Sequence, residues 1–316
     1  MKIALLIILT FSSLFAANIV MPISTFITDG AVTDIVYKDE KLYAATSAGV
    51  VNIFDTNSKK IIQRITVAKI TDFMGDKINA KIYSVDILED KVLLLSQGLK
   101  GYRELSIYEN NQLTKVITVS DKLSIAKAKF IDKNNVMLAL LSNDIISYNI
   151  KKKKENWITQ ASQSKFSNFV LKEDKSEVVV ADESGELKIY ATSNAKLLKV
   201  LSGQNLDNVF DVDYKKSIIA TAGQDRRAVI YDLESNSAYY KTSHFLIYGV
   251  GLSPNATLAA FASDEKNNVT VFKTDTQSSV GVFGGNKMTL SKILFISESN
   301  FFVATDDRVI NFYKIN

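Results

Sequence analysis

Cysteine is absent from this sequence of 316 residues, and histidine and tryptophan occur once each. The absence of cysteine excludes disulfides, thiolate zinc sites, iron–sulfur clusters, covalently attached haem and a cysteine nucleophile. The single histidine, His244, lies in "KTSHFLIYG", which offers it no partner at metal-ligand or general-base spacing. A connector-loop position is the better interpretation of His244, and we expect no catalytic residue, no metal and no cofactor.

Charge of one sign is also scarce, because 38 basic residues offset 34 acidic ones to leave a net charge of +4. That balance demands no polyanionic partner, so we expect no nucleic acid to bind. Two prolines and no low-complexity tract argue against a disordered linker, and 47% hydrophobic residues provide for a sizeable core. Neither a phosphate-binding glycine-rich loop nor a serine nucleophile elbow occurs, which favours a protein that is not an enzyme.

The first residues, "MKIALLIILTFSSLFAANIV", have the pattern of a secretory signal peptide. One lysine precedes a short apolar run, and small residues follow it up to Ala16 and Ala17. We expect residues 1–16 to be cleaved, with cleavage after Ala17 as an alternative, and the mature protein to be periplasmic without stable membrane insertion. A retained membrane anchor is the other interpretation, although spanning a bilayer normally takes about 18 apolar residues.

A unit of about 41 residues repeats along the rest of the chain. Segments such as "VVNIFDTNSKK", "LKIYATSNAK" and "AVIYDLESNS" each consist of an apolar run, an aromatic residue and a polar turn. Successive aromatic residues are 54, 40, 42, 41, 41 and 41 positions apart. The seven aromatic anchors are Phe54, Tyr108, Tyr148, Tyr190, Tyr231, Phe272 and Tyr313. Regular spacing of this kind indicates seven copies of one structural unit.

Each unit contains four short runs rich in Val, Ile, Tyr and Phe, separated by turn-forming residues. No segment after the signal peptide shows a sustained helical apolar stripe, so the fold class is all-β. In the unit around "TAGQDRRAVIYD", the Asp225 loop joins the second strand to the third, and its aspartate is of the type that caps such a turn. Four strands per unit at this period predict a seven-bladed β-propeller.

The repeats resemble those of WD40-like β-propeller proteins. Phe54-Asp55 and Tyr231-Asp232 stand where that family has a Trp-Asp pair, and "LSPNATLAAFASDEKNNVTVF" matches its middle portion. The family's Gly-His dipeptide is missing. The resemblance implies a single propeller domain over residues 17–316 that acts as a rigid interaction platform.

The chain ends predict how the ring closes. Only three residues follow Tyr313, so the last unit lacks its fourth strand. The strand-like segment "NIVMPISTFIT", which precedes the first unit, is expected to supply that outer strand of the last blade. Pro22 suits an outer edge, where a missing N–H is tolerated.

An extra segment between the first and second units, roughly residues 69–80, reads "KITDFMGDKINA". Its Phe73 and Met74 are of the types that concentrate in interface cores. A longer loop folded back over the propeller is the alternative. Other bulky or cationic residues expected on the same face are also candidates for partner binding, although each would equally suit loop packing. These further candidates are Tyr102, Arg103, Arg226, Arg227 and Tyr248.

Two other charged features have weaker functional interpretations. The lysines at 151–154 would suit an anionic surface, but they fall in a hairpin between outer strands, which favours a solvated turn. The pairs Asp211/Asp213 and Asp306/Asp307 would offer oxygen ligands to calcium, yet neither matches a calcium-loop pattern.

More narrowly, the exported, cysteine-free, Lys-, Asn- and Ile-rich chain resembles the accessory propellers of periplasmic nitrate reductase systems in epsilonproteobacteria. That resemblance implies a monomeric, non-catalytic scaffold whose partners are periplasmic proteins, including nitrate reductase components, with a role in assembly or electron supply. Two alternatives stay open: a hub subunit of an outer-membrane protein assembly complex, and a propeller enzyme of the lactonase or quinoprotein type. One fold hosts many functions, so the fold does not choose among them.

Overall fold

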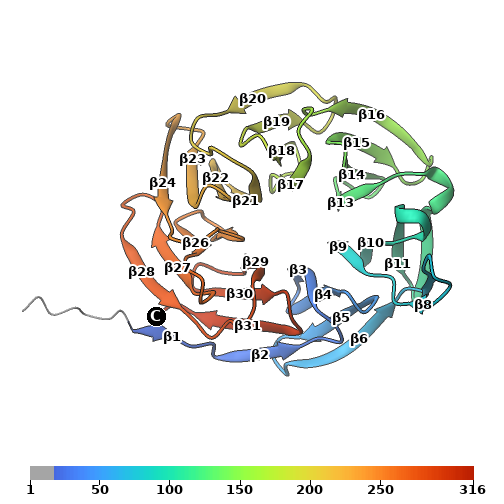
Figure 1. Ribbon diagram of the computed structural model, residues 1–316, viewed down its shortest axis with the longest axis horizontal. Helices are drawn as coiled ribbons and strands as arrows, with labels where there is room; N and C mark the ends of the chain where they lie inside the picture. The colour runs from blue at the N-terminus through green and yellow to red at the C-terminus, as the bar shows by residue number, and fades with distance from the viewer. Residues whose placement is uncertain (1–17) are drawn as a thin grey trace, which may run out of the picture.

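The computed structural model describes residues 18–316 and shows seven blades, six of four strands and one of five, arranged around a central channel (Figure 1). Blade 1 contains β3 (Val32–Lys38), β4 (Lys41–Thr46), β5 (Val50–Asp55) and β6 (Lys60–Thr66). Blade 2 contains β9 (Ile82–Leu88), β10 (Lys91–Gln97), β11 (Arg103–Glu109) and β12 (Gln112–Ile117). Blade 3 contains β13 (Ile125–Phe130), β14 (Asn135–Leu140), β15 (Asp144–Asn149) and β16 (Lys154–Gln160). Blade 4 contains β17 (Phe166–Leu171), β18 (Glu177–Asp182), β19 (Leu187–Ala191) and β20 (Leu197–Leu201).

The remaining blades complete the ring. Blade 5 contains β21 (Val209–Lys215), β22 (Ile218–Gly223), β23 (Arg227–Asp232) and β24 (Ser237–Thr242). Blade 6 contains β25 (Val250–Leu252), β26 (Leu258–Ala262), β27 (Val269–Lys273) and β28 (Ser279–Phe283). Blade 7 contains β29 (Leu290–Phe295), β30 (Asn300–Thr305), β31 (Val309–Lys314) and β2 (Ser24–Ile27). Two 3₁₀ turns, η1 (Leu99–Gly101) and η2 (Val119–Asp121), lie in blade 2 and in the connector that follows it. The prediction of an all-β, seven-bladed propeller is confirmed.

Burial follows the position of a strand within its blade. The second strands are buried on both faces, as in β10, where the run Val92–Ser96 is buried throughout. Such strands are continuous apolar runs because a neighbouring blade covers each face. The fourth strands alternate between covered and exposed positions, as in β6, because successive side chains point to opposite faces and one of the two faces is open to solvent.

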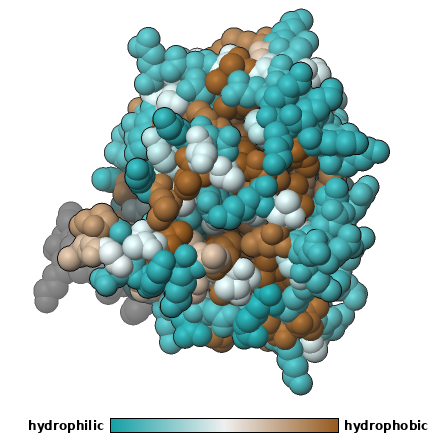
Figure 2. Space-filling view, turned by 90° about the vertical axis from the view of Figure 1, so that its right-hand side faces the viewer, coloured by the Kyte–Doolittle hydropathy of each residue, from teal (hydrophilic) through white to brown (hydrophobic). Residues whose placement is uncertain are grey.

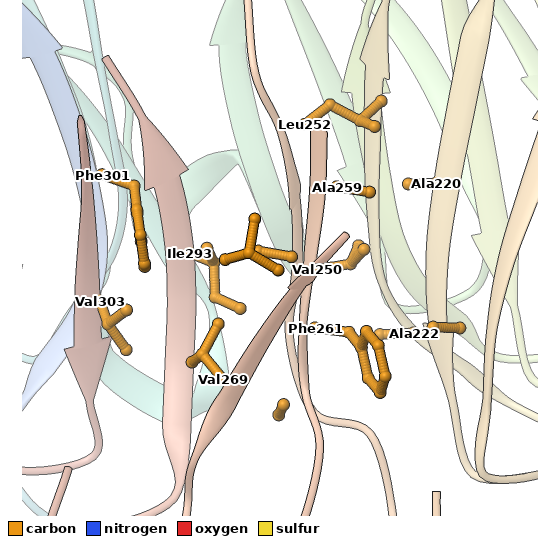
Figure 3. Close-up of a cluster of buried hydrophobic side chains, with 14 of the residues drawn as sticks. Ala220, Ala222, Val250, Leu252, Ala259, Phe261, Val269, Ile293, Phe301 and Val303 are labelled. Atoms are coloured by element: carbon orange, nitrogen blue, oxygen red, sulfur yellow. The ribbon is translucent and has the colours of Figure 1, made fainter. Parts of the chain in front are cut away.

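The hydrophobic core lies between the blades. Figure 3 shows one part of it, where Ala222 of blade 5, Phe261 of blade 6 and Phe301 of blade 7 belong to one buried cluster. All seven aromatic anchors lie on third strands, and six of them are buried. Tyr108 is partly exposed, and its hydroxyl accepts a hydrogen bond from Gln63 Nε2 at 2.6 Å. The repeating aromatic residue is therefore chiefly a blade-to-blade packing group.

The N-terminal segment closes the ring as predicted. β2 pairs antiparallel with β31, with Ser24 opposite Phe312 and Ile27 opposite Val309. The two residues of β1 (Ile19–Val20) depart from the prediction, because they pair in parallel with β28 and add a fifth strand to blade 6. Pro22 separates the two pairings, and its lack of an N–H suits this change of partner. The chain therefore fastens blades 6 and 7 together at their outer edges, where β1 and β2 lie side by side with β28 and β31 (Figure 1).

The predicted signal peptide, residues 1–16, lies outside the described residues. Within residues 18–316, no helix has the length and apolar character needed to cross a membrane.

Truncation of Phe26 should destabilise the whole ring. Its buried ring packs edge-on against Phe54 at 5.4 Å and Phe302 at 5.6 Å between centroids, which joins blades 1 and 7. We expect Phe26→Ala to lower the free energy of unfolding in urea by roughly 3–5 kcal/mol. The neighbouring Ile27→Ala, at a side chain that is 51% exposed, should change it by less than about 0.5 kcal/mol. Equal effects of the two variants would contradict closure through Phe26.

Candidate functional site

The central channel is lined by the innermost strands of the blades, which ring the opening in Figure 1. In six blades, the register between the innermost strand and the second strand shifts near the start of the innermost strand, which marks a β-bulge. The residue that follows the bulge projects polar groups toward the channel, in keeping with the use of bulges to re-aim side chains. In these six blades the equivalent residues are Asp34, Ser84, Lys127, Asn168, Asp211 and Lys292.

Adjacent innermost strands in residues 18–316 pack together without forming a hydrogen-bonded ladder. These side chains therefore make the hydrogen bonds across the seams, the junctions between neighbouring blades. On one side of the channel, Asp34 accepts hydrogen bonds from Val85 N at 3.1 Å and from Lys129 Nζ at 2.9 Å. Lys129 also donates to Val85 O at 2.7 Å. Three blades are thereby joined through one carboxylate and one ammonium group.

A second network lies on the other side of the channel around Asp211. Its carboxylate accepts from Lys292 Nζ at 3.1 Å, from Asn168 Nδ2 at 3.0 Å and from Val250 N at 3.3 Å. Asp213, two residues further along β21, accepts from Leu252 N at 2.8 Å. The Asp211 and Asp213 carboxylates thus accept hydrogen bonds from groups on blades 4, 6 and 7. Within residues 18–316, no group of three or more His, Asp or Glu side chains is placed to hold a metal ion.

The networks shift the pKa values of their members. Burial raises the pKa of Asp34, but the attraction of Lys129 and Lys127 and its hydrogen bonds outweigh burial, so the net pKa lies below its usual value. Burial opposes the charge on Lys292, yet Asp211, Asp213 and Asp34 raise its pKa above the ordinary lysine value. Lys127 differs, since burial and repulsion from Lys292 and Lys129 lower its pKa to about 7.

A small cavity of about 240 Å³ opens at the channel mouth. Its polar wall includes Lys127, Ser291 and Lys292, and its aromatic wall includes Phe210 and Tyr248. The two aromatic rings stack with their centroids 5.3 Å apart and their planes 10° apart. The predicted partner-binding residue Tyr248 is therefore part of the channel mouth.

The extra segment between blades 1 and 2 forms a separate hairpin of β7 (Ile70–Thr71) and β8 (Lys77–Ile78). Asp72 Oδ1 accepts hydrogen bonds from Met74 N and Asp76 N, both at 2.9 Å, and thereby braces the turn. Phe73 is 97% exposed and Met74 is 74% exposed at the tip. The braced turn presents both apolar side chains to solvent, so the alternative of a loop folded back over the propeller is wrong for this tip.

A groove of about 530 Å³ runs between this hairpin and η1. Ile70, Phe73 and Ile78 line one side of it, and Leu99 and Lys100 line the other. Figure 2, which faces the side of the ring where β8 lies in Figure 1, shows hydrophobic side chains reaching the surface among hydrophilic ones. We refer to Ile70, Phe73, Met74, Ile78 and Leu99 as the hairpin patch.

Two of the predicted candidates, Tyr102 and Arg103, make contacts within the loop around η1. The Arg103 guanidinium lies 4.0 Å from the centroid of the Tyr83 ring, and its Nη1 donates to Gly101 O at 2.8 Å. Tyr102 closes the same loop through a hydrogen bond from Gly98 N to Tyr102 O at 2.9 Å. These two candidates directly follow η1, whose residues Leu99–Gly101 line the groove beside the hairpin.

The other two candidates lie on blade 5. Arg226 is exposed in the turn before β23, with φ of 63°. The Arg227 guanidinium lies 4.1 Å from the centroid of the Tyr240 ring and donates to Gln204 O at 2.7 Å. Asp225 accepts from Arg227 N at 3.0 Å, which confirms the predicted turn cap. The seven candidates thus divide into one group at blades 1 and 2 and another at blades 5 and 6, on opposite sides of the ring in Figure 1.

The remaining charged features lie where the sequence places them. The lysine run at 151–154 is exposed in the hairpin between β15 and β16, as predicted. His244 is exposed in the connector between blades 5 and 6.

Sequence reasoning missed the channel residues Asp34, Lys127, Lys129, Asn168 and Lys292. A signal for them was present, since "VTDIV", "IAKAKF", "FSNFV" and "LSKILF" each place a polar residue within an otherwise apolar first strand. Asp34, Lys127, Asn168 and Lys292 precede their aromatic anchors by 20, 21, 22 and 21 positions, so an alignment of the units that allowed shifts of one residue would have put them at one repeat position.

Removal of the Asp34 charge should destabilise the ring. Asp34→Asn leaves Lys129 without its carboxylate partner at 2.9 Å in a mostly buried site, which is expected to cost about 3 kcal/mol at neutral pH. Because the folded pKa of Asp34 is lowered, its contribution is present above the unfolded pKa and is lost as pH falls through the folded pKa. Chemical denaturation at pH 7 and pH 3 should therefore show the difference shrinking in acid. The exposed Asp90→Asn serves as the control, and a pH-independent difference would contradict the ion pair.

A search of protein-family models found no match to this chain. A search of curated proteins likewise found no match. The seven-bladed β-propeller fold is established by the structure itself.

Proposed function

We propose that this protein is a non-catalytic, periplasmic interaction scaffold and that its partner binds the hairpin patch. The single observation that carries the proposal is the 97% exposure of Phe73 on a turn that Asp72 holds in shape. A phenylalanine this exposed gains no burial in the isolated chain, whereas burial against a partner would gain about 2 kcal/mol. Aromatic and Met side chains are enriched at interface cores, which is the composition found at this tip.

The surroundings of the tip suit a protein partner. The groove beside Phe73 offers a receiving surface for one or two apolar side chains, and Leu99 on its far wall is 43% exposed. Lys69, Asp72, Asp76 and Lys77 surround the apolar centre with charge of both signs. An apolar centre with a polar rim is the usual anatomy of a specific interface.

The hairpin adds no strand to the blades of the propeller, although its Ile70 packs against the core between blades 1 and 2. β7 pairs with β8 in a sheet of its own, and neither strand joins a blade. The four strands of blade 2 are complete without it. The fold does not need this segment for strand pairing, yet the segment has a defined turn. Binding to a partner explains this combination better than a role in stability does.

The proposed partners are components of the periplasmic nitrate reductase system. The support is the resemblance of this chain to NapL, the accessory propeller of such systems in epsilonproteobacteria, in its processing region, its degenerate repeats and its size. In that role the protein would assist assembly or electron supply by holding a partner on a rigid disc. A hub role in outer-membrane protein assembly is the alternative that the same surface would serve.

Replacement of Phe73 should weaken partner binding without affecting the fold. In an affinity pull-down of the tagged protein from periplasmic extract, we expect mass spectrometry to identify nitrate reductase subunits with the parent protein. Phe73→Asp should weaken binding about 30-fold, the effect of losing a hot spot worth about 2 kcal/mol. Its melting temperature should match that of the parent because the side chain is exposed.

Ile62→Asp provides the matched control, since Ile62 is also exposed, at 53%, but lies on the outer strand β6. Equal loss of binding with Ile62→Asp would show that general surface hydrophobicity, not the hairpin patch, retains the partner. Retention of outer-membrane assembly proteins in place of reductase subunits would support the hub role. Absence of any specifically retained protein would overturn the scaffold proposal.

A further inference from the structure

One charged group in the channel lacks a counterion. Lys129 pairs with Asp34 at 2.9 Å, and Lys292 pairs with Asp211 at 3.1 Å. Within residues 18–316, no carboxylate lies within 4.0 Å of Lys127 Nζ, which donates to Asn168 Oδ1 at 2.6 Å and to Phe169 O at 2.8 Å. Both of these acceptors are neutral. A partly buried ammonium group with only neutral partners is electrostatically incomplete.

Lys127 lines the 240 Å³ cavity at the channel mouth. An ammonium group has three N–H donors, and the hydrogen bonds to Asn168 and Phe169 use two of them. Lys127 therefore keeps one donor for a ligand in the cavity. The aromatic stack of Phe210 and Tyr248 forms another part of the cavity wall.

The size of the cavity restricts what it can hold. Drug-sized ligands usually occupy 300–1,000 Å³, whereas a water molecule takes about 30 Å³ of liquid volume. A volume of about 240 Å³ therefore suits a small ion with a few waters. Asp34 and Asp211 also line the cavity, but they pair with Lys129 and Lys292. A single negative charge would supply the counterion that Lys127 lacks.

We propose that the channel mouth is a binding site for a small monovalent oxyanion, which accepts a hydrogen bond from the ammonium of Lys127. An oxygen of a nitrate or carboxylate ion accepts a strong, charge-assisted hydrogen bond from an ammonium group. This site is independent of the hairpin patch and of any protein partner.

The charges around Lys127 predict how binding depends on pH. Burial and repulsion from Lys292 on β29 and Lys129 on its own strand lower its pKa to about 7, although attraction to Asp34 on β3 and Asp211 on β21 opposes this shift. Of the strands packed directly against β13, β9 presents Asp86 and Tyr83, β10 carries only Lys91, which pairs with Glu109, and β14 and β17 carry no ionisable residue. A bound anion would raise this pKa, so binding at pH 7–8 should take up a proton.

The test is calorimetric titration of the full-length mature protein with sodium acetate, sodium nitrate and sodium sulfate at constant ionic strength. We expect saturable binding of a monovalent oxyanion at millimolar concentration and weaker binding of sulfate. The affinity should fall nearly tenfold between pH 7.5 and 8.5, as expected when only protonated Lys127 binds. Titrations in two buffers of different ionisation enthalpy should show proton uptake that is small at pH 6 and approaches one per anion near pH 8.

Three variants separate this site from general anion effects. Lys127→Met should remove binding, whereas Lys151→Met, at an exposed lysine of the β15–β16 hairpin, should leave it unchanged. Lys127→Arg should retain binding and lose the pH dependence, because arginine keeps its charge throughout this range. Unchanged binding by Lys127→Met, or pH-independent binding by the parent protein, would overturn the proposal. The parent titrations stand by themselves if a variant fails to fold, and absence of saturable binding there would also reject the site.

Discussion

The structure depends on closure of the ring by a strand from the opposite end of the chain. Each blade buries both faces of its middle strands against its neighbours, so an open array would leave two large apolar faces in water. Pairing of β2 with β31 brings residues 24–27 beside residues 309–312 and makes blade 7 complete. Phe26 then lies between Phe54 and Phe302, which carries the core across the junction of the two ends. Without cysteine, this closure is made by hydrogen bonds and packing alone.

The closed ring creates the channel, and the channel imposes its own requirement. The innermost strands of neighbouring blades do not pair by main-chain hydrogen bonds, so side chains must make hydrogen bonds to the main-chain groups along each junction. Asp34, Asp86 and Asp213 accept from Val85 N, Phe130 N and Leu252 N of the following blades. Two of the three channel lysines, Lys129 and Lys292, balance carboxylates within these networks. Lys127 is the one that the networks leave without a counterion, and the proposed anion site follows from this imbalance.

The hairpin patch and the channel mouth serve different kinds of ligand. The hairpin is an addition outside the blades whose exposed phenylalanine suits a protein surface, whereas the channel mouth is a small polar cavity. They also differ in what holds them in shape: the hairpin depends on the local Asp72 turn, and the cavity depends on residues of six blades that meet at the channel. A change at one site should therefore leave the other intact, which allows the two proposals to be judged separately.

The sequence by itself determined the all-β class, the seven blades, the strand order and the closing strand, because these follow from local periodicity and from a repeat near 41 residues. It also located the extra segment with Phe73 and Met74, since an insertion interrupts the repeat. Only the tertiary structure decided that β1 joins blade 6, that Arg103 and Arg227 stack on tyrosines, and that Lys127 lacks a counterion. The reason is physical: the partners of Lys127, Lys129 and Lys292 lie about one to two repeats away along the chain, and only curvature into a ring brings their charges within hydrogen-bonding distance.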